Sequence, residues 1–239
     1  MHSFKTEAIV IRRRNFSEKD RILTLFSEKF GKIEAISKGC RRPGSRLCAI
    51  SDIGTIAKFF IHLTKSIDII REAESIFIPR KAIGKIDKTK RLSFLFKFVD
   101  KSYHEHEAHE VSYKALKNVL QAISNYNGQL QFLFFLAKAI EDLGLHPQLY
   151  NCGVCGKKIS ENESIGFSTQ NGVEHLDCSK TELVNISKDE IKLLRYLFAL
   201  DLNEGGIGKV SPDIYKKVYQ LLRLYIEWHF GKIIPEETI

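Results

Sequence analysis

The chain of 239 residues has no stretch that approaches the ~18–20 consecutive apolar residues of a membrane-spanning helix. Its first residues, MHSFKTEAIV, lack the basic, apolar and small-residue regions of a secretory signal peptide. We therefore expect a cytoplasmic protein without a membrane partner. Five cysteines are too few and too unevenly spaced for a disulfide scaffold. In a reducing compartment, a close cysteine pair is more typical of a metal or redox site.

The sequence also lacks the common catalytic motifs. It contains no HExxH, no G-x-S-x-G, no phosphate-binding P-loop and no paired acidic metal motif. A group of histidines and glutamates between His104 and His109 lies between two predicted helices, and we interpret it as a solvated loop. We find no internal repeat and no low-complexity segment. The chain is thus predicted to have no catalytic residues.

Positive charge is concentrated near the N-terminus. The formal net charge is +8. Residues 1–80 hold 16 Lys and Arg against 9 Asp and Glu, a net charge of +7, whereas residues 81–239 hold 21 against 20, a net charge of +1. A concentrated basic field attracts polyanions, and neutralising phosphates releases condensed counterions. Nucleic acid is the leading partner class; the alternative is a basic surface that only keeps the protein soluble.

The first third of the chain is rich in predicted strands. Apolar or β-branched runs begin at Ala8, Ile22, Ile33, Thr55 and Ile67, and glycine and proline separate them. Five short strands in about 75 residues are typical of an OB-type barrel.

The period of the apolar residues changes to helical after a predicted linker from Arg80 to Lys90. Helices are expected over residues 91–103, 110–125 and 129–143, and the apolar run QFLFFLAKAI indicates that the third is central and buried.

Further helices are expected after a polar insert that runs from Cys152 to Cys178. Ser187 and Glu190 form a plausible capping box, and Ser211-Pro212 starts a helix that should end near Gly231. We predict an α+β multi-domain fold: a five-stranded OB-fold β-barrel over 1–80, a helical domain over 81–150 and 181–239, and a zinc-knuckle insert over 151–180.

The insert contains the strongest local motif, Cys152-x-x-Cys155 followed by His175-x-x-Cys178. Two chelating pairs about 19 residues apart are typical of a structural zinc site, in which four protein ligands leave no position for activated water. Asp177 or Glu174 could compete with His175 as a ligand. A redox CxxC is the rival interpretation, but it needs a thioredoxin-like βαβ setting, which is absent here. A site that has lost its metal and kept the loop is also possible.

Three clusters of cations point to phosphate binding. The predicted DNA-contacting residues are Arg12, Arg13, Arg14, Lys19, Arg21, Lys38, Arg41, Arg42 and Arg46. OB-folds bind strands across one barrel face and use the adjoining loops as walls, while aromatic side chains stack on bases. The stacking candidates are Phe16, in a polar loop, and Phe59 and Phe60, of which one must face the barrel core because strand residues alternate. No sequence-specific recognition motif is present, so binding should depend steeply on salt and weakly on base sequence.

The segment TEAIVIRRRNFSEKDRILTLFSEKFGKIEAISKGCRRPGSR, residues 6–46, resembles the opening of RecO-type recombination mediators. The TEAIV strand, the SEKDRILTLF segment, the GKI turn and the basic loop carry the likeness. The helical middle with its CxxCG insert and the helical end also fit, so the resemblance extends over essentially the whole chain. In the family, Cys usually stands where His175 stands here; since imidazole is a good zinc ligand, this departure bears on metal occupancy and not on fold.

The resemblance implies a non-catalytic DNA repair protein of the bacterial cytoplasm, associated with the nucleoid. It implies binding to single-stranded and double-stranded DNA and annealing of complementary strands. It also implies contact with RecR and with the C-terminal tail of single-stranded DNA-binding protein, so that RecA can load. Two alternatives stay open at this stage: a zinc-containing scaffold that binds acidic protein tails, and a metal-dependent enzyme.

Overall fold

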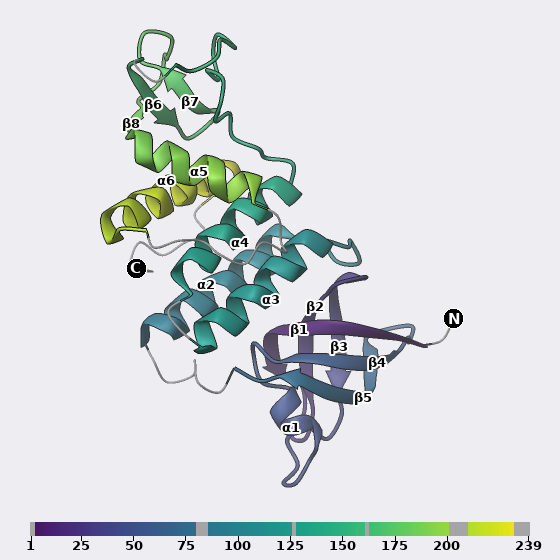
Figure 1. The fold of residues 1–239 in the computed structure, drawn as a ribbon. Helices are drawn as coiled ribbons and strands as arrows, with labels where there is room; N and C mark the ends of the chain where they lie inside the picture. Colours follow the sequence, from purple (N-terminus) through teal and green to yellow (C-terminus); the bar gives the residue numbers. More distant parts are fainter. Residues whose placement is uncertain (1–2, 80–85, 126–127, 161–162, 201–209, 232–239) are drawn as a thin grey trace. The chain divides into compact units, whose positions relative to one another are not determined.

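The structure is a computed structural model that describes residues 3–79, 86–125, 128–160, 163–200 and 210–231 (Figure 1). The chain divides into two compact units, which are described separately: the first runs from Met1 to Gly128 and the second from Gln129 to Glu237. The domain boundaries that the sequence predicted at residues 80, 150 and 180 stay predictions.

The first unit contains five strands, a short helix and two long helices. They are β1 (Ser3–Asn15), β2 (Arg21–Ser27), β3 (Gly31–Ser37), α1 (Leu47–Ile50), β4 (Ile56–His62), β5 (Asp68–Phe77), α2 (Ile86–Ser102) and α3 (Glu110–Asn125).

The five strands close into a barrel in the order β1-β2-β3-β5-β4, and β4 pairs back to β1. All pairings are antiparallel except that of β3 with β5. This is the five-stranded Greek-key barrel of an OB-fold. The predicted fold class, a barrel followed by a helical region, is therefore confirmed.

Strand β1 is apolar on both faces because each face is buried by a different layer. Ala8 and Val10 belong to the core inside the barrel. Ile9 and Ile11 point the other way and are also buried, on the wall that α2 packs against. Phe26 of β2 lies in the same outer layer, with ring centroids 5.2 Å from Tyr103 and 6.2 Å from Tyr113. The two helices thus cover part of the barrel exterior that would otherwise expose apolar side chains.

Strand alternation separates the neighbours Phe59 and Phe60. Phe59 is only 1% exposed and belongs to the barrel core, so it is not available for stacking on a base. Phe60 lies on the outer face, where the Lys5 ammonium is 5.7 Å from its ring centroid. The sequence indicated that one of the two faces inward, and the structure shows which.

The loop between α2 and α3 is partly packed, although the sequence suggested a solvated loop. Its side chains from His104 to Glu107 are exposed. Its backbone, however, is bonded to β3: the His106 N–H donates to the Lys32 carbonyl at 3.0 Å. Gly31, with φ of +64°, allows this approach, because a Cβ there would lie 1.9 Å from the Glu107 carbonyl oxygen.

Two further local expectations are corrected. Helix α2 already begins at Ile86, inside the predicted linker, whose residues 80–85 lie outside the described part of the chain. The short helix α1 was not predicted; it follows the basic loop and contributes Ile50 to the barrel core.

The second unit contains three helices and a small sheet. They are α4 (Gln129–Asp142), β6 (Ile165–Ser168), β7 (Gly172–His175), β8 (Val184–Asn185), α5 (Lys188–Ala199) and α6 (Pro212–Phe230). The strands form an antiparallel sheet in the order β7-β6-β8. The sequence predicted a polar insert there but no strands.

Helix α4 is the centre of this unit, as predicted: its residues from Phe132 to Ile140 are all buried, and it packs against α5 and α6. Even Lys138 is buried, because its ammonium group donates to the Phe198 carbonyl at 2.8 Å. The capping box of Ser187 and Glu190 at α5 is confirmed, as is the start of α6 at Ser211-Pro212.

Within the described residues, no helix is long and apolar enough to cross a membrane.

Glu7 ties the barrel to α3 and generates a prediction about stability. Its carboxylate accepts hydrogen bonds from the Tyr113 hydroxyl at 2.8 Å and from Lys117 at 2.6 Å. Partial burial raises the pKa of Glu7, but the bonds from Lys117 and Tyr113 outweigh it and hold this pKa below the ordinary value of 4.5. A lowered pKa stabilises the fold above that value, and the stabilisation is lost as the pH falls through the folded-state pKa.

We expect Glu7→Gln to lower the free energy of unfolding at pH 7 by about 1–3 kcal/mol, as for hydrogen bonds to a charged group. The difference from the wild type should be constant above pH ~5 and should shrink as the pH falls below ~4.5. Denaturant unfolding of both proteins between pH 3 and 7 measures this. A difference that does not change with pH would show that the charge of Glu7 is not what stabilises the contact.

Candidate nucleic-acid interface and metal cluster

Six of the nine predicted DNA-contacting residues lie on two loops at one end of the barrel, or directly beside them. We call the following set the basic loop surface: Lys19, Arg21, Lys38, Arg41, Arg42 and Arg46. The β1–β2 loop and the first residue of β2 supply Lys19 and Arg21, and the loop between β3 and α1 supplies the others. The two loops meet because Arg21 pairs with Ser37, the last residue of β3.

The Asp20 carboxylate joins the two loops. It accepts a hydrogen bond from the Gly39 N–H at 2.7 Å, and Gly39 has a φ of +66°, which favours glycine. This bond, together with Ser17 and the charges of Lys38 and Arg42, holds the pKa of Asp20 below its ordinary value. Asp20 is therefore ionised at neutral pH and keeps one negative charge beneath the cations.

Arg41 adds a second connection between the loops. Its N–H donates to the Lys19 carbonyl at 3.0 Å, and its guanidinium donates to the Ser17 carbonyl at 2.9 Å. Phe16 stands next to this junction and is 53% exposed. An exposed ring beside ordered cations is the combination that binds single strands without base specificity.

None of the six cations of the basic loop surface has an acidic side chain within ion-pair distance among the described residues. The nearby Asp20 carboxylate offsets the charge of Lys38 and Arg42 in part, but it forms an ion pair with neither. Phosphate oxygens are ligands of suitable charge for such a surface.

The other three predicted residues, Arg12, Arg13 and Arg14, are already paired. Arg12 contacts Glu34 at 2.9 Å and Asp100 at 3.2 Å, and Arg14 contacts Glu34 at 3.2 Å. Arg13 forms an ion pair with Asp52. These side chains are exposed, but nearby carboxylates already neutralise part of their charge.

Glu34 is the main partner of these arginines. Partial burial raises the pKa of Glu34, but hydrogen bonds from Arg12 and Arg14 and the charges of both outweigh this, so its pKa lies below 4.5. Sequence reasoning missed Glu34. The strand register places Glu34 beside Thr24 and Thr24 beside Arg12, and this register would have revealed Glu34. The register is known only once the strands are paired.

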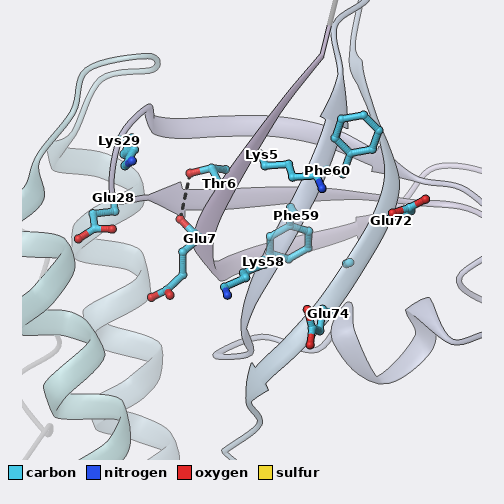
Figure 2. Close-up of a pocket in the computed structure, with 11 residues that line it drawn as sticks. Lys5, Thr6, Glu7, Glu28, Lys29, Lys58, Phe59, Phe60, Glu72 and Glu74 are labelled. Atoms are coloured by element: carbon cyan, nitrogen blue, oxygen red, sulfur yellow. Dashed lines mark hydrogen bonds between the residues drawn. The ribbon is translucent and has the colours of Figure 1, made fainter.

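A cavity of about 440 Å³ opens on strands β1, β4 and β5 and beside the β2–β3 turn (Figure 2). None of the predicted DNA-contacting residues lines it. Both lysines and glutamates line it, so it lacks the single sign of charge that a polyanion site needs. Its charged and aromatic lining consists of Lys5, Glu7, Glu28, Lys29, Lys58, Phe59, Phe60, Glu72 and Glu74.

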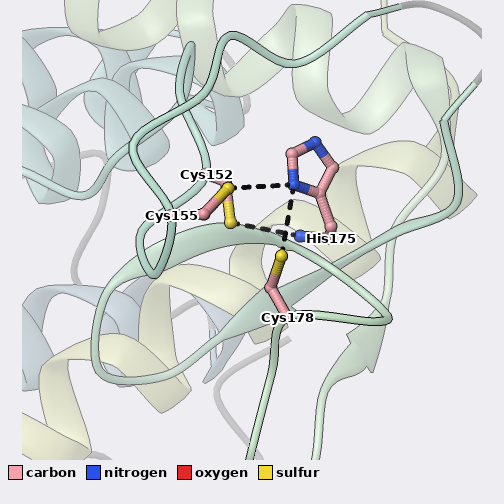
Figure 3. Close-up of side chains that lie close together, drawn as sticks. All are labelled: Cys152, Cys155, His175 and Cys178. Atoms are coloured by element: carbon pink, nitrogen blue, oxygen red, sulfur yellow. Dashed lines mark hydrogen bonds between the residues drawn. The ribbon is translucent and has the colours of Figure 1, made fainter.

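In the second unit, the four predicted metal ligands converge (Figure 3). The ligand atoms of Cys152, Cys155, His175 and Cys178 all lie within 4.8 Å of one another. The His175 Nδ1 lies 3.5 Å from the Cys155 Sγ and 3.7 Å from the Cys178 Sγ. Ligands of a tetrahedral zinc ion, bound at about 2.0–2.3 Å, are separated by roughly 3.5–3.8 Å. The donor set and its spacing fit a metal ion that is held by protein ligands alone.

The local backbone prepares this cluster for a cation. Burial opposes ionisation of Cys152, but hydrogen bonds from the N–H groups of Cys155, His175 and Val154 outweigh it and lower the pKa of Cys152 to about 6. The pKa of Cys178 is raised to about 11, because Cys155 hydrogen-bonds to it and burial adds to the effect. Thiolates that lie this close together repel one another, and a bound dication would relieve that repulsion. Metal binding would then release the protons of the thiols.

The competing ligands that the sequence left open are placed elsewhere. Glu174 is buried and accepts a hydrogen bond from Asn171 at 2.8 Å, and Asp177 is exposed outside the cluster. Sequence reasoning missed Glu163, which contacts the His175 Nε2 at 3.2 Å and so orients the ring with Nδ1 toward the thiols. No spacing rule pointed to it.

Comparisons with known proteins point to the same family for both parts of the chain. Residues 1–78 match the family model "Recombination protein O N terminal", and residues 84–236 match "Recombination protein O C terminal". The chain is 28% identical over 234 residues to "DNA repair protein RecO" of Desulforamulus reducens, covering 97% of this chain and 91% of the relative. It is 25% identical over 232 residues to the protein of that name from Bacillus cytotoxicus, covering 95% of this chain and 92% of the relative. It is 24% identical over 231 residues to that from Clostridium novyi, covering 96% of this chain and 90% of the relative.

The cluster generates a prediction about metal binding. We expect Cys155→Ser to abolish stoichiometric metal binding and to lower the melting temperature by several degrees, since about 1 kcal/mol corresponds to roughly 2–4 °C for a chain of this size. Cys48→Ser, which changes an exposed cysteine outside the cluster, is the matched control. Metal analysis and thermal unfolding with and without a chelator measure both effects. Full metal content in Cys155→Ser, or equal loss in Cys48→Ser, would contradict the assignment.

Proposed function

The chain belongs to the RecO family of DNA repair proteins, and we propose from this premise that it binds single-stranded DNA through the basic loop surface and anneals complementary strands. Double-stranded DNA is a second ligand of the same surface, because the contacts are to phosphates. The observation that carries this proposal is the group of cations that lack acidic partners on two loops fixed together by Asp20 and Arg41.

Annealing follows from charge neutralisation. Two complementary strands repel each other through their phosphates, and cations that neutralise phosphates on both lower that repulsion. The loops supply charge without reading base edges, so pairing between the strands alone selects the product. Phe16 can stack on any base, because every base presents a π-face.

The nine predicted residues divide into two roles in this proposal. The basic loop surface makes the first phosphate contacts, because its cations need not leave a carboxylate. Arg12, Arg13 and Arg14 contribute later, once phosphates compete with Glu34, Asp52 and Asp100. Exposed ion pairs stabilise by only ~0–1 kcal/mol each, so phosphates can replace these carboxylates at little cost in free energy.

We also propose that the metal ion is zinc and that its role is structural. Zinc favours three thiolates and an imidazole in a tetrahedral shell. Cys152 and Cys155 hold it from one turn, and His175 and Cys178 hold it from the end of β7 and the turn that follows. With four protein ligands, it ties these segments of the insert together and leaves no position for a substrate.

The remaining parts of the proposal rest on the family resemblance. The protein acts as a mediator without a catalytic step, in the bacterial cytoplasm and on the nucleoid. It works with RecR and with the C-terminal tail of single-stranded DNA-binding protein so that RecA loads on DNA. Its family membership and the absence of catalytic motifs from the sequence support this view.

The division between paired and unpaired arginines gives a direct test. We expect Arg41→Ala/Arg42→Ala to reduce the dependence of log affinity on log salt by about 1 for each lost phosphate contact. Arg12→Ala/Arg14→Ala removes the same formal charge from side chains that are already paired with carboxylates, so fewer phosphate contacts are lost and its effect should be smaller. Fluorescence anisotropy with a labelled single strand, titrated at several salt concentrations, measures both.

Arg71→Ala/Lys97→Ala is the control, because it removes two exposed cations of the first unit that are outside both clusters. It should change the salt dependence little. If the loop variant kept the wild-type affinity and salt dependence, the basic loop surface would not be the DNA site.

A further inference from the structure

An aromatic side chain in the second unit is held on a fixed cation. Tyr150 is 52% exposed, and the Arg195 guanidinium carbon lies 4.8 Å from its ring centroid. Arg195 is itself fixed, because its Nε donates to the Leu149 carbonyl at 2.9 Å. An exposed tyrosine normally samples several rotamers, and this cation–π contact restricts it. The result is a ring that is ordered and still open to solvent.

Helix α5 continues the positive charge away from this ring. Lys188, Lys192 and Arg195 are spaced four and three residues apart, so they lie along one face of the helix. Lys188 and Lys192 are exposed. The acidic residues of the same helix are Asp189 and Glu190 in its first turn, and the Glu190 carboxylate is occupied by the Ser187 N–H.

The chain that follows the turn of the first cysteine pair is bonded to the backbone of Tyr150 and carries two more cations. The Ile159 N–H donates to the Tyr150 carbonyl at 2.9 Å, which sets the chain after the turn beside the tyrosine. Lys157 and Lys158 directly precede Ile159 and are exposed. Residues 143–160 contain no aspartate or glutamate. The chain that runs beside Tyr150 therefore carries cations from this turn, and α5 adds Arg195 at the ring itself.

We propose that this surface is a second contact site for single-stranded DNA, in which Tyr150 stacks on a base and the surrounding cations neutralise the adjacent phosphates. We call it the tyrosine platform; it consists of Tyr150, Lys157, Lys158, Lys188, Lys192 and Arg195. The inference rests on the proposed function and deepens it: annealing brings two strands onto one protein, and the tyrosine platform gives the second strand contacts in addition to those of the basic loop surface.

Base stacking distinguishes this site from a general anion surface. An acidic protein segment would be attracted by the same lysines, but it would gain nothing specific from an ordered ring. Stacking on an aromatic side chain is tolerant of base sequence and strengthens strand binding considerably. The pairing of Tyr150 with Arg195 leaves the ring ordered before DNA arrives, which reduces the entropy lost on binding.

The test uses the full chain and measures the second strand separately from the first. The protein is loaded with one equivalent of an unlabelled single strand, and binding of a labelled, non-complementary strand is then followed by anisotropy. We expect Tyr150→Ala to weaken this second binding roughly tenfold, as for the loss of one stacked base. Tyr150→Phe keeps the ring and should bind as the wild type does. Trp228→Ala, which removes another exposed aromatic residue of the second unit (58% exposed), is the control and should change nothing.

Two further probes identify the ligand. An oligomer of abasic sites carries phosphates without bases, so Tyr150→Ala should not alter its binding. Iododeoxyuridine in the second strand should crosslink under ultraviolet light to the peptide that contains Tyr150. A poly-glutamate peptide should displace the second strand only weakly.

The outcomes separate this inference from the function on which it rests. If the first strand binds and crosslinks to the loops near Phe16 and Arg41, but Tyr150→Ala has no effect on the second strand, the tyrosine platform is wrong and the proposed function stands. Equal loss of abasic and normal strands, or strong displacement by poly-glutamate regardless of Tyr150, also overturns it. If no strand binds to the wild type, the proposed function itself fails.

Discussion

The hydrogen bond from the Gly39 N–H to the Asp20 carboxylate is the contact on which the DNA-binding account depends. It holds together two loops that are 19 residues apart in the sequence and that carry most of the unpaired positive charge of the barrel. An acidic residue among cations would normally weaken binding to a polyanion. Here it accepts a hydrogen bond from the Gly39 backbone and so helps to organise the two loops, together with the contacts of Arg41.

Pairing of charges divides the predicted DNA-contacting cations into two groups. The nine predicted DNA-contacting residues look equivalent as a sequence, yet the fold gives three of them acidic partners on β3, after α1 and on α2. These ion pairs are exposed and weak, so they moderate the charge of the strand and do not abolish it. The second unit also contains both bound and solvated cations. Arg195 is anchored to a backbone carbonyl and orders an aromatic ring, whereas the neighbouring lysines are exposed to solvent.

Local patterns predicted the features that depend on neighbouring residues. Strand alternation, the capping box at Ser187 and the Cys-x-x-Cys and His-x-x-Cys spacings each act within a few residues, and the structure contains all of them. Features that depend on tertiary pairing could not be read in this way. The contact of Arg12 with Asp100 joins residues 88 positions apart, and the orientation of Phe59 rather than Phe60 toward the core depends on the register of β4 with β1. The packing of the loop after α2 onto Gly31 likewise needs the helices to be placed against the barrel first.

The most direct test of the account is the affinity of Asp20→Ala for single-stranded DNA at a fixed, moderate salt concentration, with Asp20→Asn beside it. Both variants make the basic loop surface more positive by one charge, but only the asparagine keeps an oxygen that can accept from Gly39. If Asp20 organises the loops, Asp20→Ala binds DNA more weakly than the wild type despite its added charge, and Asp20→Asn binds more tightly than Asp20→Ala. If Asp20→Ala instead binds more tightly than the wild type, charge alone governs the surface and the organising role of Asp20 is refuted.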